Sequence, residues 1–329
     1  MMTIKQFQQW FDVRFSKVLE EKSAEFLKSS DSAAIREVLS YLPTYAQHGK
    51  RFRPYMVYVG YTTEGGTHDI FPLLASIEFL HLFCLVQDDI VDNEGMRHGT
   101  ATIHKKVATQ YHSREIGKSV AMIVGDLLMA WSFEHFQKIE SVEPYTADDA
   151  LKEFRFLLSE VLHGQLLDIL LLTDDNPSKD LISKSMYLKS AQYSFFRPLL
   201  IGMMLAGAGE ESIEFAEDYA VNLGMAFQMQ DDLADCLSDI KGGQPTMLSW
   251  YMFNTASSIE RKEFELYFSK EWSEEEEEKL MGILEESGAL SFVQQTMDDY
   301  FLEAEDAIFT HDKSGEEIWQ DIINMVTEG

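Results

Sequence analysis

The chain has 329 residues, 45% of them hydrophobic, and its 56 acidic and 27 basic side chains give a formal charge of −29 at pH 7. This acidity excludes a protein that binds nucleic acid or an anionic membrane surface through clustered Lys and Arg. The two cysteines, Cys84 and Cys236, stand far apart in apolar stretches, which excludes a disulfide framework and favours a soluble, cytoplasmic protein. The longest nearly apolar run, from Pro198, is too short to cross a bilayer, so no transmembrane segment is expected.

Helical periodicity begins with Phe7, Trp10, Phe11, Phe15 and Val18, which are spaced for one face of a first helix. Long apolar helices follow, several of them apolar on more than one face as central helices are, at residues 76–92, 119–136, 153–172, 185–207 and 215–237. A more polar helix is predicted at 273–287, where an acidic first turn suits a helix N-terminus. The chain has few prolines and glycines and no linker-like segment. It therefore predicts an all-α fold, a single-domain helical bundle over residues 1–329.

Two acidic motifs end two of these apolar helices: Asp88, Asp89 and Asp92 in "DDIVD", and Asp231, Asp232 and Asp235 in "DDLAD". Side chains four residues apart are neighbours on a helix, so the first and third aspartates of each motif can share a ligand. One such cluster would as readily be a solvated helix end, but two matching clusters are hard to explain in that way. Crowded carboxylates need cations. Oxygen ligands without His or Cys indicate Mg²⁺, which completes its shell with substrate phosphate oxygens.

The basic side chains that a phosphate would need are scarce in so acidic a chain. Lys50 and Arg53 lie in "GKRFRP", Arg97 follows the first acidic motif, and Lys189 lies within an apolar helix. Taken alone, Lys50 and Arg53 would be surface salt bridges, whereas the apolar surroundings of Lys189 favour a functional role. Together with the acidic motifs, these cations predict a diphosphate site.

These motifs make the sequence resemble the trans-isoprenyl diphosphate synthases, also called polyprenyl synthetases. The matching stretches are "GKRFRP", "EFLHLFCLVQDDIVDNEGMRHG", "GDLLMAW", "HGQLLDI", "YLKSAQYSFFRPL" and "GMAFQMQDDLAD", in the family's order between residues 45 and 250. The resemblance implies an all-α fold around a deep central apolar cavity and a homodimer. It also implies a Mg²⁺-dependent condensation of isopentenyl diphosphate with an allylic diphosphate.

Roles for single residues follow from the resemblance in the same way. All six aspartates would hold Mg²⁺ against the allylic diphosphate, which Arg97, Lys189 and Gln228 would also contact. Ser190 stands where the family usually has threonine and keeps a hydroxyl there. Isopentenyl diphosphate would be held by Lys50, Arg53 and His81, with Gly49 allowing a close backbone approach. His81 by itself would be read as a core histidine, and its place before Asp88 is what marks it as a ligand.

Two positions depart from the family pattern. His98 stands where the family usually has a second arginine that contacts isopentenyl diphosphate, and a neutral imidazole is a weaker phosphate partner than a guanidinium. The loop after Asp235 is short: Gln244 stands where one lysine is expected, and Lys241 is the candidate substitute for another.

Product length is predicted from Phe83, five residues before Asp88, and from Phe79, one turn further back. In the family that the sequence resembles, a bulky residue five positions before the first aspartate marks short-chain enzymes. Ordinary core packing is nevertheless the commoner role of a phenylalanine. We expect geranylgeranyl diphosphate as the main product and farnesyl diphosphate as the next choice. Two alternatives stay open: a terpene-synthase-like enzyme that ionises an allylic diphosphate without elongation, and a non-catalytic regulatory subunit.

Overall fold

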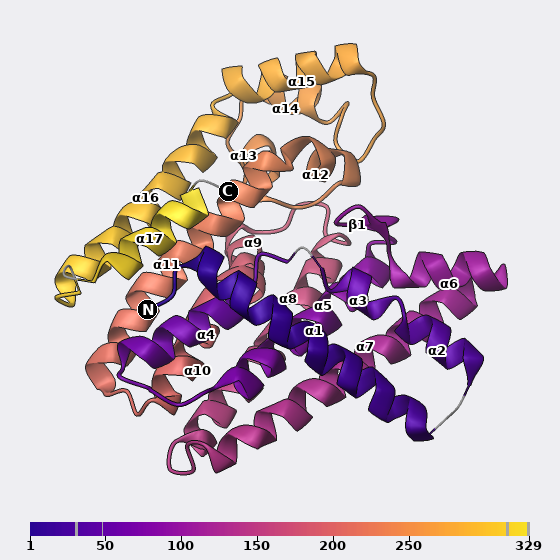
Figure 1. Ribbon diagram of the computed structural model, residues 1–329. Coiled ribbons are helices and arrows are strands. Elements are labelled where there is room, and N and C mark those ends of the chain that lie inside the picture. Colours follow the sequence, from indigo (N-terminus) through magenta and orange to yellow (C-terminus); the bar gives the residue numbers. More distant parts are fainter. Residues whose placement is uncertain (30–31, 48, 314–315, 328–329) are drawn as a thin grey trace. The chain divides into compact units, whose positions relative to one another are not determined.

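The computed structural model in Figure 1 describes residues 1–29, 32–47, 49–313 and 316–327. Almost all regular structure in these ranges is helical, so the prediction of an all-α fold is confirmed. The packing divides the chain into two compact units, Met1–Leu151 with Ile201–Gly207 (unit 1) and Lys152–Leu200 with Ala208–Gly329 (unit 2). A single domain over the whole length stays a prediction.

Unit 1 contains, in chain order, α1 (Ile4–Ser29), α2 (Ala33–Leu39), α3 (Leu42–Tyr45), α4 (Phe52–Thr63), α5 (Phe71–Val91), β1 (Met96–Arg97), β2 (Thr100–Ala101), α6 (Ile103–Tyr111), α7 (Arg114–Gln137) and the 3₁₀ turn η1 (Lys138–Ser141). Two helices cross the unit boundary: α8 (Ala147–Leu171) begins in unit 1, and α10 (Arg197–Leu205) ends in it.

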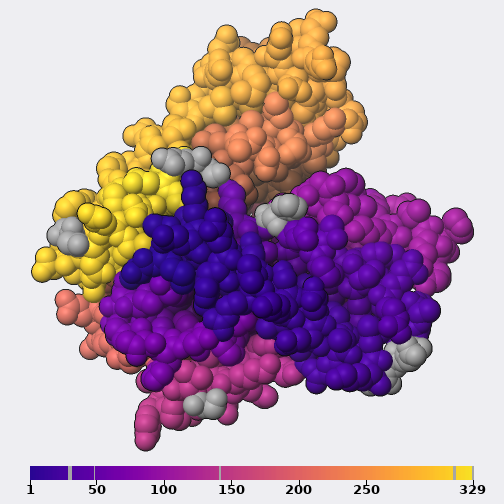
Figure 2. Space-filling model, in the orientation of Figure 1, coloured from indigo at the N-terminus to yellow at the C-terminus, as the bar shows by residue number. Residues whose placement is uncertain are grey.

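The core of unit 1 forms around α5, which packs along α7 (Figure 1). On α1, Phe7, Phe11 and Phe15 are at most 2% exposed, and their rings follow one another at i, i+4 spacing with centroids 5.6 and 5.3 Å apart. The predicted apolar face of the first helix is therefore present, and the indigo N-terminal segment presents its other face at the surface (Figure 2). Burial of these three rings contributes about 1.5–3 kcal/mol each relative to exposure.

One helical stretch among the described residues, 114–140, is long and apolar enough to cross a membrane by length and composition alone. Core helices of soluble proteins pass the same test. Here the stretch buries Leu128 and Trp131 in unit 1, whereas Ile116, Met122 and Ile123 on its other side are 44–61% exposed.

Unit 2 contains the rest of α8 and α10, together with α9 (Lys179–Met186), the π-helix η2 (Tyr187–Phe196), α11 (Glu210–Ala234), α12 (Cys236–Gly242), α13 (Met247–Asn254), α14 (Ser258–Phe264), α15 (Glu274–Glu286), α16 (Ala289–Thr310) and α17 (Glu317–Thr327). Helix α11 packs against both η2 and α16. The predicted acidic helix is α15, whose first turn holds four exposed glutamates after a Ser273–Glu276 capping box, as expected for a helix N-terminus in solvent.

Candidate active site

The first acidic motif lies at the carboxyl end of α5. Asp88 and Asp89 belong to the last turn, and Asp92 is the C-cap, whose backbone N–H donates to the Asp88 carbonyl oxygen at 2.9 Å. This end of a helix carries the negative pole of its dipole, which disfavours each nearby carboxylate by about 0.3–1 kcal/mol. A bound cation would remove that penalty. The carboxylate donor set and its position therefore fit a divalent metal that is completed by phosphate oxygens.

Asp89 differs from its neighbours because it is only 1% exposed and both of its carboxylate oxygens are engaged. The Tyr45 hydroxyl donates to Oδ2 at 2.6 Å, and Arg97 Nε donates to Oδ1 at 2.6 Å. Burial and the Asp89 charge together raise the pKa of the Tyr45 phenol, so it stays a donor. Burial lowers the pKa of Arg97, but the Asp89 charge and hydrogen bond reverse this and raise it. Asp89 therefore holds Arg97 in place.

Arg97 lies in a two-stranded hairpin that periodicity did not predict. Arg97 pairs with Thr100 and Met96 with Ala101, which leaves His98 and Gly99 as the two-residue loop. Both have positive φ, 48° and 77°, as a type I′ hairpin turn requires. Histidine is among the few residues other than glycine that adopt this conformation readily. His98 therefore serves the turn, and its side chain is exposed at the tip.

The residues predicted to hold isopentenyl diphosphate lie at the start of α4 and in the middle of α5. Arg53 Nη1 is 3.2 Å from His81 Nε2. Burial, and then the charge of Arg53, lowers the pKa of His81 well below its ordinary value of 6.5. The imidazole is therefore neutral, and Nε2 accepts from the guanidinium. Lys50 is exposed, and its carbonyl oxygen accepts from Gln8 Nε2 of α1 at 2.7 Å.

The second acidic motif, in unit 2, repeats the geometry of the first. Asp231 and Asp232 lie in the last turn of α11, and the backbone N–H of the C-cap Asp235 donates to the Asp231 carbonyl oxygen at 2.9 Å. Asp231 and Asp235 are exposed, whereas Asp232 accepts from Gln228 Nε2 at 2.8 Å. Burial raises the pKa of Asp232 to about 7 against the opposite effect of that hydrogen bond. In both motifs a backbone hydrogen bond connects the third aspartate to the first. In both, the carboxylate of the second aspartate accepts a hydrogen bond from another side chain.

Asp239, on α12, is a carboxylate that the sequence reading missed. Burial, followed by the charges of Asp235, Asp231 and Asp168, raises its pKa to about 7. Its place four residues after Asp235 was the available signal. Within the described ranges, no three or more His, Cys, Asp or Glu side chains are arranged as a ready metal cage.

Lys189 lies in η2, and its Nζ donates to Asp168 Oδ2 of α8 at 2.7 Å. Ser185 Oγ donates to the other oxygen of Asp168 at 3.2 Å. A π-helix is an uncommon conformation that often marks functional sites, and here it carries Lys189 and the buried Ser190. Asp168 was not predicted as a site residue, although it is the aspartate of the quoted stretch "HGQLLDI".

Three further predicted residues have surroundings of their own. Lys241 pairs with Glu271 and lies 5.7 Å from the centre of the Trp272 ring. Phe79 is fully buried, with its ring 5.0 Å from Phe15 and 5.7 Å from Trp131, as in ordinary core packing. Phe83 is 5% exposed, and its ring lies 3.6 Å from the point that a Cβ on Gly125 of α7 would occupy.

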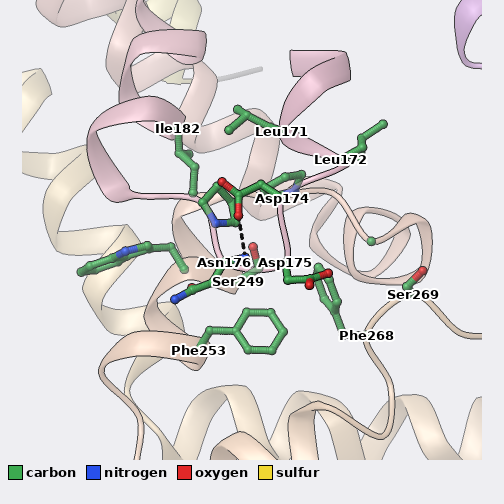
Figure 3. A pocket seen from close by; sticks show the side chains of 14 residues that line it. Leu171, Leu172, Asp174, Asp175, Asn176, Ile182, Ser249, Phe253, Phe268 and Ser269 are labelled. Atoms are coloured by element: carbon green, nitrogen blue, oxygen red, sulfur yellow. Dashed lines mark hydrogen bonds between the residues drawn. The ribbon is translucent and has the colours of Figure 1, made fainter. Parts of the chain in front are cut away.

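Unit 2 also contains a cavity of about 300 Å³, lined on one side by Leu171, Asp174 and Asp175 and on the other by Phe253 and Phe268 (Figure 3). The Asp174 carboxylate accepts from the backbone N–H of Asn176 at 3.1 Å. None of the predicted site residues lines this cavity. The chemistry indicated by the sequence therefore lies elsewhere, at the helix ends that carry the acidic motifs.

Comparisons with known proteins agree with the sequence motifs. The polyprenyl synthetase family model matches residues 32–285. A short chain isoprenyl diphosphate synthase of Methanocaldococcus jannaschii is 28% identical over 252 residues, 73% of each chain. A geranylgeranyl diphosphate synthase of Methanosarcina mazei is 26% identical over 271 residues, 79% of each chain. The solved geranylgeranyl pyrophosphate synthase of Corynebacterium glutamicum, complexed with isoprenyl diphosphate and magnesium, has the same fold. Its TM-score is 0.81 at 23% identity, over 95% of this chain and 97% of that one.

Proposed function

The chain belongs to the polyprenyl synthetase family, and on that premise we propose that it is a short-chain trans-prenyltransferase. It condenses isopentenyl diphosphate with an allylic diphosphate, and its main product is geranylgeranyl diphosphate, with farnesyl diphosphate as the next choice. The observation that carries the proposal is the pair of matched acidic motifs, each at the carboxyl end of a long apolar helix. The Arg53–His81 contact speaks against a terpene-synthase-like enzyme, and six intact aspartates speak against a regulatory subunit.

Mg²⁺ is the proposed cofactor, held by Asp88, Asp89 and Asp92 in one motif and by Asp231, Asp232 and Asp235 in the other. When bound, it would stabilise the charge that develops on the departing diphosphate. Asp89 has a further role, because it also accepts hydrogen bonds from Tyr45 and Arg97 and so orients Arg97.

Two cations of this chain are fixed before substrate arrives: Arg97 by Asp89, and Lys189 by Asp168. Donors that are already oriented stabilise developing charge without reorganisation in the transition state. The neutral His81 leaves the positive charge of Arg53 undiminished for the second diphosphate. No side chain is assigned as the final base, and the released diphosphate takes the proton.

The metal assignment is tested by turnover in EDTA and by Asp88→Ala and Asp231→Ala. Each variant removes charge stabilisation from the transition state, so kcat should fall by on the order of a hundredfold or more. Full activity in EDTA would remove the metal from the mechanism.

The reaction itself is tested with labelled isopentenyl diphosphate and a series of allylic diphosphates, followed by chromatography of dephosphorylated products. A longer prenyl diphosphate supports the proposal. A hydrocarbon or an alcohol without incorporated label would identify a terpene-synthase-like enzyme, and no product at all would favour the regulatory subunit.

We also propose that the protein is a homodimer and is located in the cytoplasm. Ile123 on α7 is 61% exposed and Leu166 on α8 is 57% exposed, and a second copy of the chain would cover such side chains at an obligate interface. Ile123→Glu and Leu166→Glu should therefore shift the sedimentation coefficient toward that of a monomer. Exposed apolar side chains recur along α7 (Ile116, Ile123) and along α8 (Leu162, Leu166, Leu170), whereas Ile259 is a single exposed apolar side chain on α14. Ile259→Glu is therefore the control that should leave the sedimentation coefficient unchanged.

A further inference from the structure

The Arg51 side chain, between the predicted ligands Lys50 and Arg53, makes three hydrogen bonds. It is 6% exposed. Its Nε donates to Asp12 Oδ1 at 2.7 Å, Nη1 donates to Glu78 Oε1 at 2.5 Å, and Nη2 donates to the Ala46 carbonyl oxygen at 2.5 Å. One guanidinium therefore ties together α1, the end of α3 and the middle of α5.

The aromatic side chains of α1 enclose the same guanidinium. Its central carbon lies 5.9 Å from the ring centres of both Phe11 and Phe15. Its Nη1 lies 2.7 Å from the point that a Cβ on Gly49 would occupy. Gly49 therefore leaves room for the Arg51 side chain. This reason for a glycine differs from the one that the family resemblance implies, a close approach of the backbone to a substrate.

The backbone of Arg51 is held in an unusual state. Its φ is 55°, in the left-handed region, at the N-cap of α4. A residue other than glycine keeps this conformation only where its surroundings enforce it. The three hydrogen bonds of the side chain supply that enforcement, so without them the segment that carries Lys50 and Arg53 can relax.

Glu78 connects this anchor to the predicted substrate ligands. It is 1% exposed and lies three residues before His81 on α5, so the two side chains are helix neighbours. Arg51 meets Glu78, and Arg53 meets His81. These two contacts, one helical turn apart on α5, therefore fix the position of the start of α4 along α5.

We propose that Arg51 and Glu78 are positioning residues that set the register of Lys50, Arg53 and His81 and so determine affinity for isopentenyl diphosphate. The proposal rests on the proposed function, because it takes these three residues as the isopentenyl diphosphate ligands. The simpler alternative is a buried ion pair that contributes to stability alone.

The test is steady-state kinetics of Arg51→Met, Glu78→Gln and Asp12→Asn with both substrates varied. Arg51→Met removes all three bonds, Glu78→Gln keeps an acceptor without its charge, and Asp12→Asn weakens the half-exposed contact. The KM for isopentenyl diphosphate should rise most in Arg51→Met, less in Glu78→Gln and least in Asp12→Asn. For Arg51→Met the rise should be on the order of tenfold to a hundredfold. The KM for the allylic diphosphate should change much less.

Lys22→Met is the matched control, because Lys22 is another buried cation of unit 1. Its side chain is 8% exposed, and its Nζ lies 2.7 Å from Glu134 Oε1. This variant should lose thermal stability yet keep both KM values. Circular dichroism identifies the variants that are folded at the assay temperature. If Arg51→Met does not fold, Glu78→Gln and Asp12→Asn decide the question.

Equal rises in both KM values, or no rise in the folded variants, would overturn the positioning role. Equilibrium dialysis of labelled isopentenyl diphosphate gives a second readout, in which weakened binding by Glu78→Gln supports the proposal and unchanged binding refutes it. A wild-type enzyme that fails to elongate any allylic diphosphate would instead refute the proposed function, so the two failures are distinguishable.

Discussion

Gly164→Ala should disable the π-helix that carries Lys189 while leaving the substrate ligands themselves intact. A Cβ at position 164 would lie 2.8 Å from Lys189 Cγ, 2.9 Å from Leu188 Cβ and 3.1 Å from the Lys189 backbone nitrogen. Ordinary contacts between such atoms lie near 3.5–4.0 Å, so η2 must move by roughly 0.5–1 Å. The Lys189–Asp168 pair, 2.7 Å long, would be stretched or rotated with it.

The size of the effect follows from two opposing contributions to the free energy of unfolding. Overpacking costs about 1–3 kcal/mol, and replacing a helical glycine by alanine returns about 0.5–1 kcal/mol. A net loss of stability of about 1 kcal/mol is expected. The kcat should fall by on the order of tenfold to a hundredfold, because a displacement near 1 Å at a charged catalytic group has that effect.

The assay is kcat at saturating concentrations of both diphosphates, beside thermal unfolding followed by circular dichroism. Gly282→Ala is the matched control: it lies in helix α15 of the same unit, and a Cβ there would meet nothing within 4 Å. That variant should be slightly more stable and fully active. A Gly164→Ala enzyme with wild-type kcat would show that the position of Lys189 in η2 does not govern turnover.

Three more predictions concern unit 1. His98→Arg should lower the KM for isopentenyl diphosphate by about fivefold to thirtyfold, because a charged contact adds about 1–2 kcal/mol. The cost of about 1 kcal/mol for arginine at a positive φ is present with and without substrate, so it lowers stability instead. His98→Asn, which suits the turn, should not lower the KM, and equal constants in all three proteins would remove His98 from that site. Phe83→Ala should open about 5.4 Å of depth, one helical turn, and lengthen the products seen by chromatography. An unchanged distribution would make Phe83 a core residue. The half-buried, neutral His81 has a pKa lowered from its ordinary value of 6.5 by desolvation and then by the charge of Arg53. The unfolded chain therefore binds one more proton, and stability is lost as pH falls through 6.5. The free energy of unfolding in urea should therefore fall less between neutral and mildly acidic pH for His81→Gln than for wild type. An equal fall in both proteins would contradict the neutral imidazole.

The aspartate motifs and the helices that they end could be predicted because both signals are local. The period of the apolar residues marks α5 and α11, and polar residues at i and i+4 mark the turn where each helix stops. The aromatic face of α1 follows from the same periodicity. The family resemblance adds roles to these residues, because its motifs are also short stretches of sequence.

Tertiary structure decided which side chains hold these residues in place. Asp89 meets Tyr45 from 44 residues away, and Arg51 meets Glu78 across 27. No periodicity connects such positions, since a buried acid takes whichever donor the fold brings within about 3 Å. The π-helical turn at Lys189 is likewise fixed by packing, because η2 lies against Gly224 of α11 and Gly164 of α8 with no room for a Cβ. Sequence thus determined which residues carry charge at the ends of α5 and α11. Packing determined that Asp89 also anchors Arg97, because the fold brings Tyr45 and Arg97 within hydrogen-bond distance of its two carboxylate oxygens.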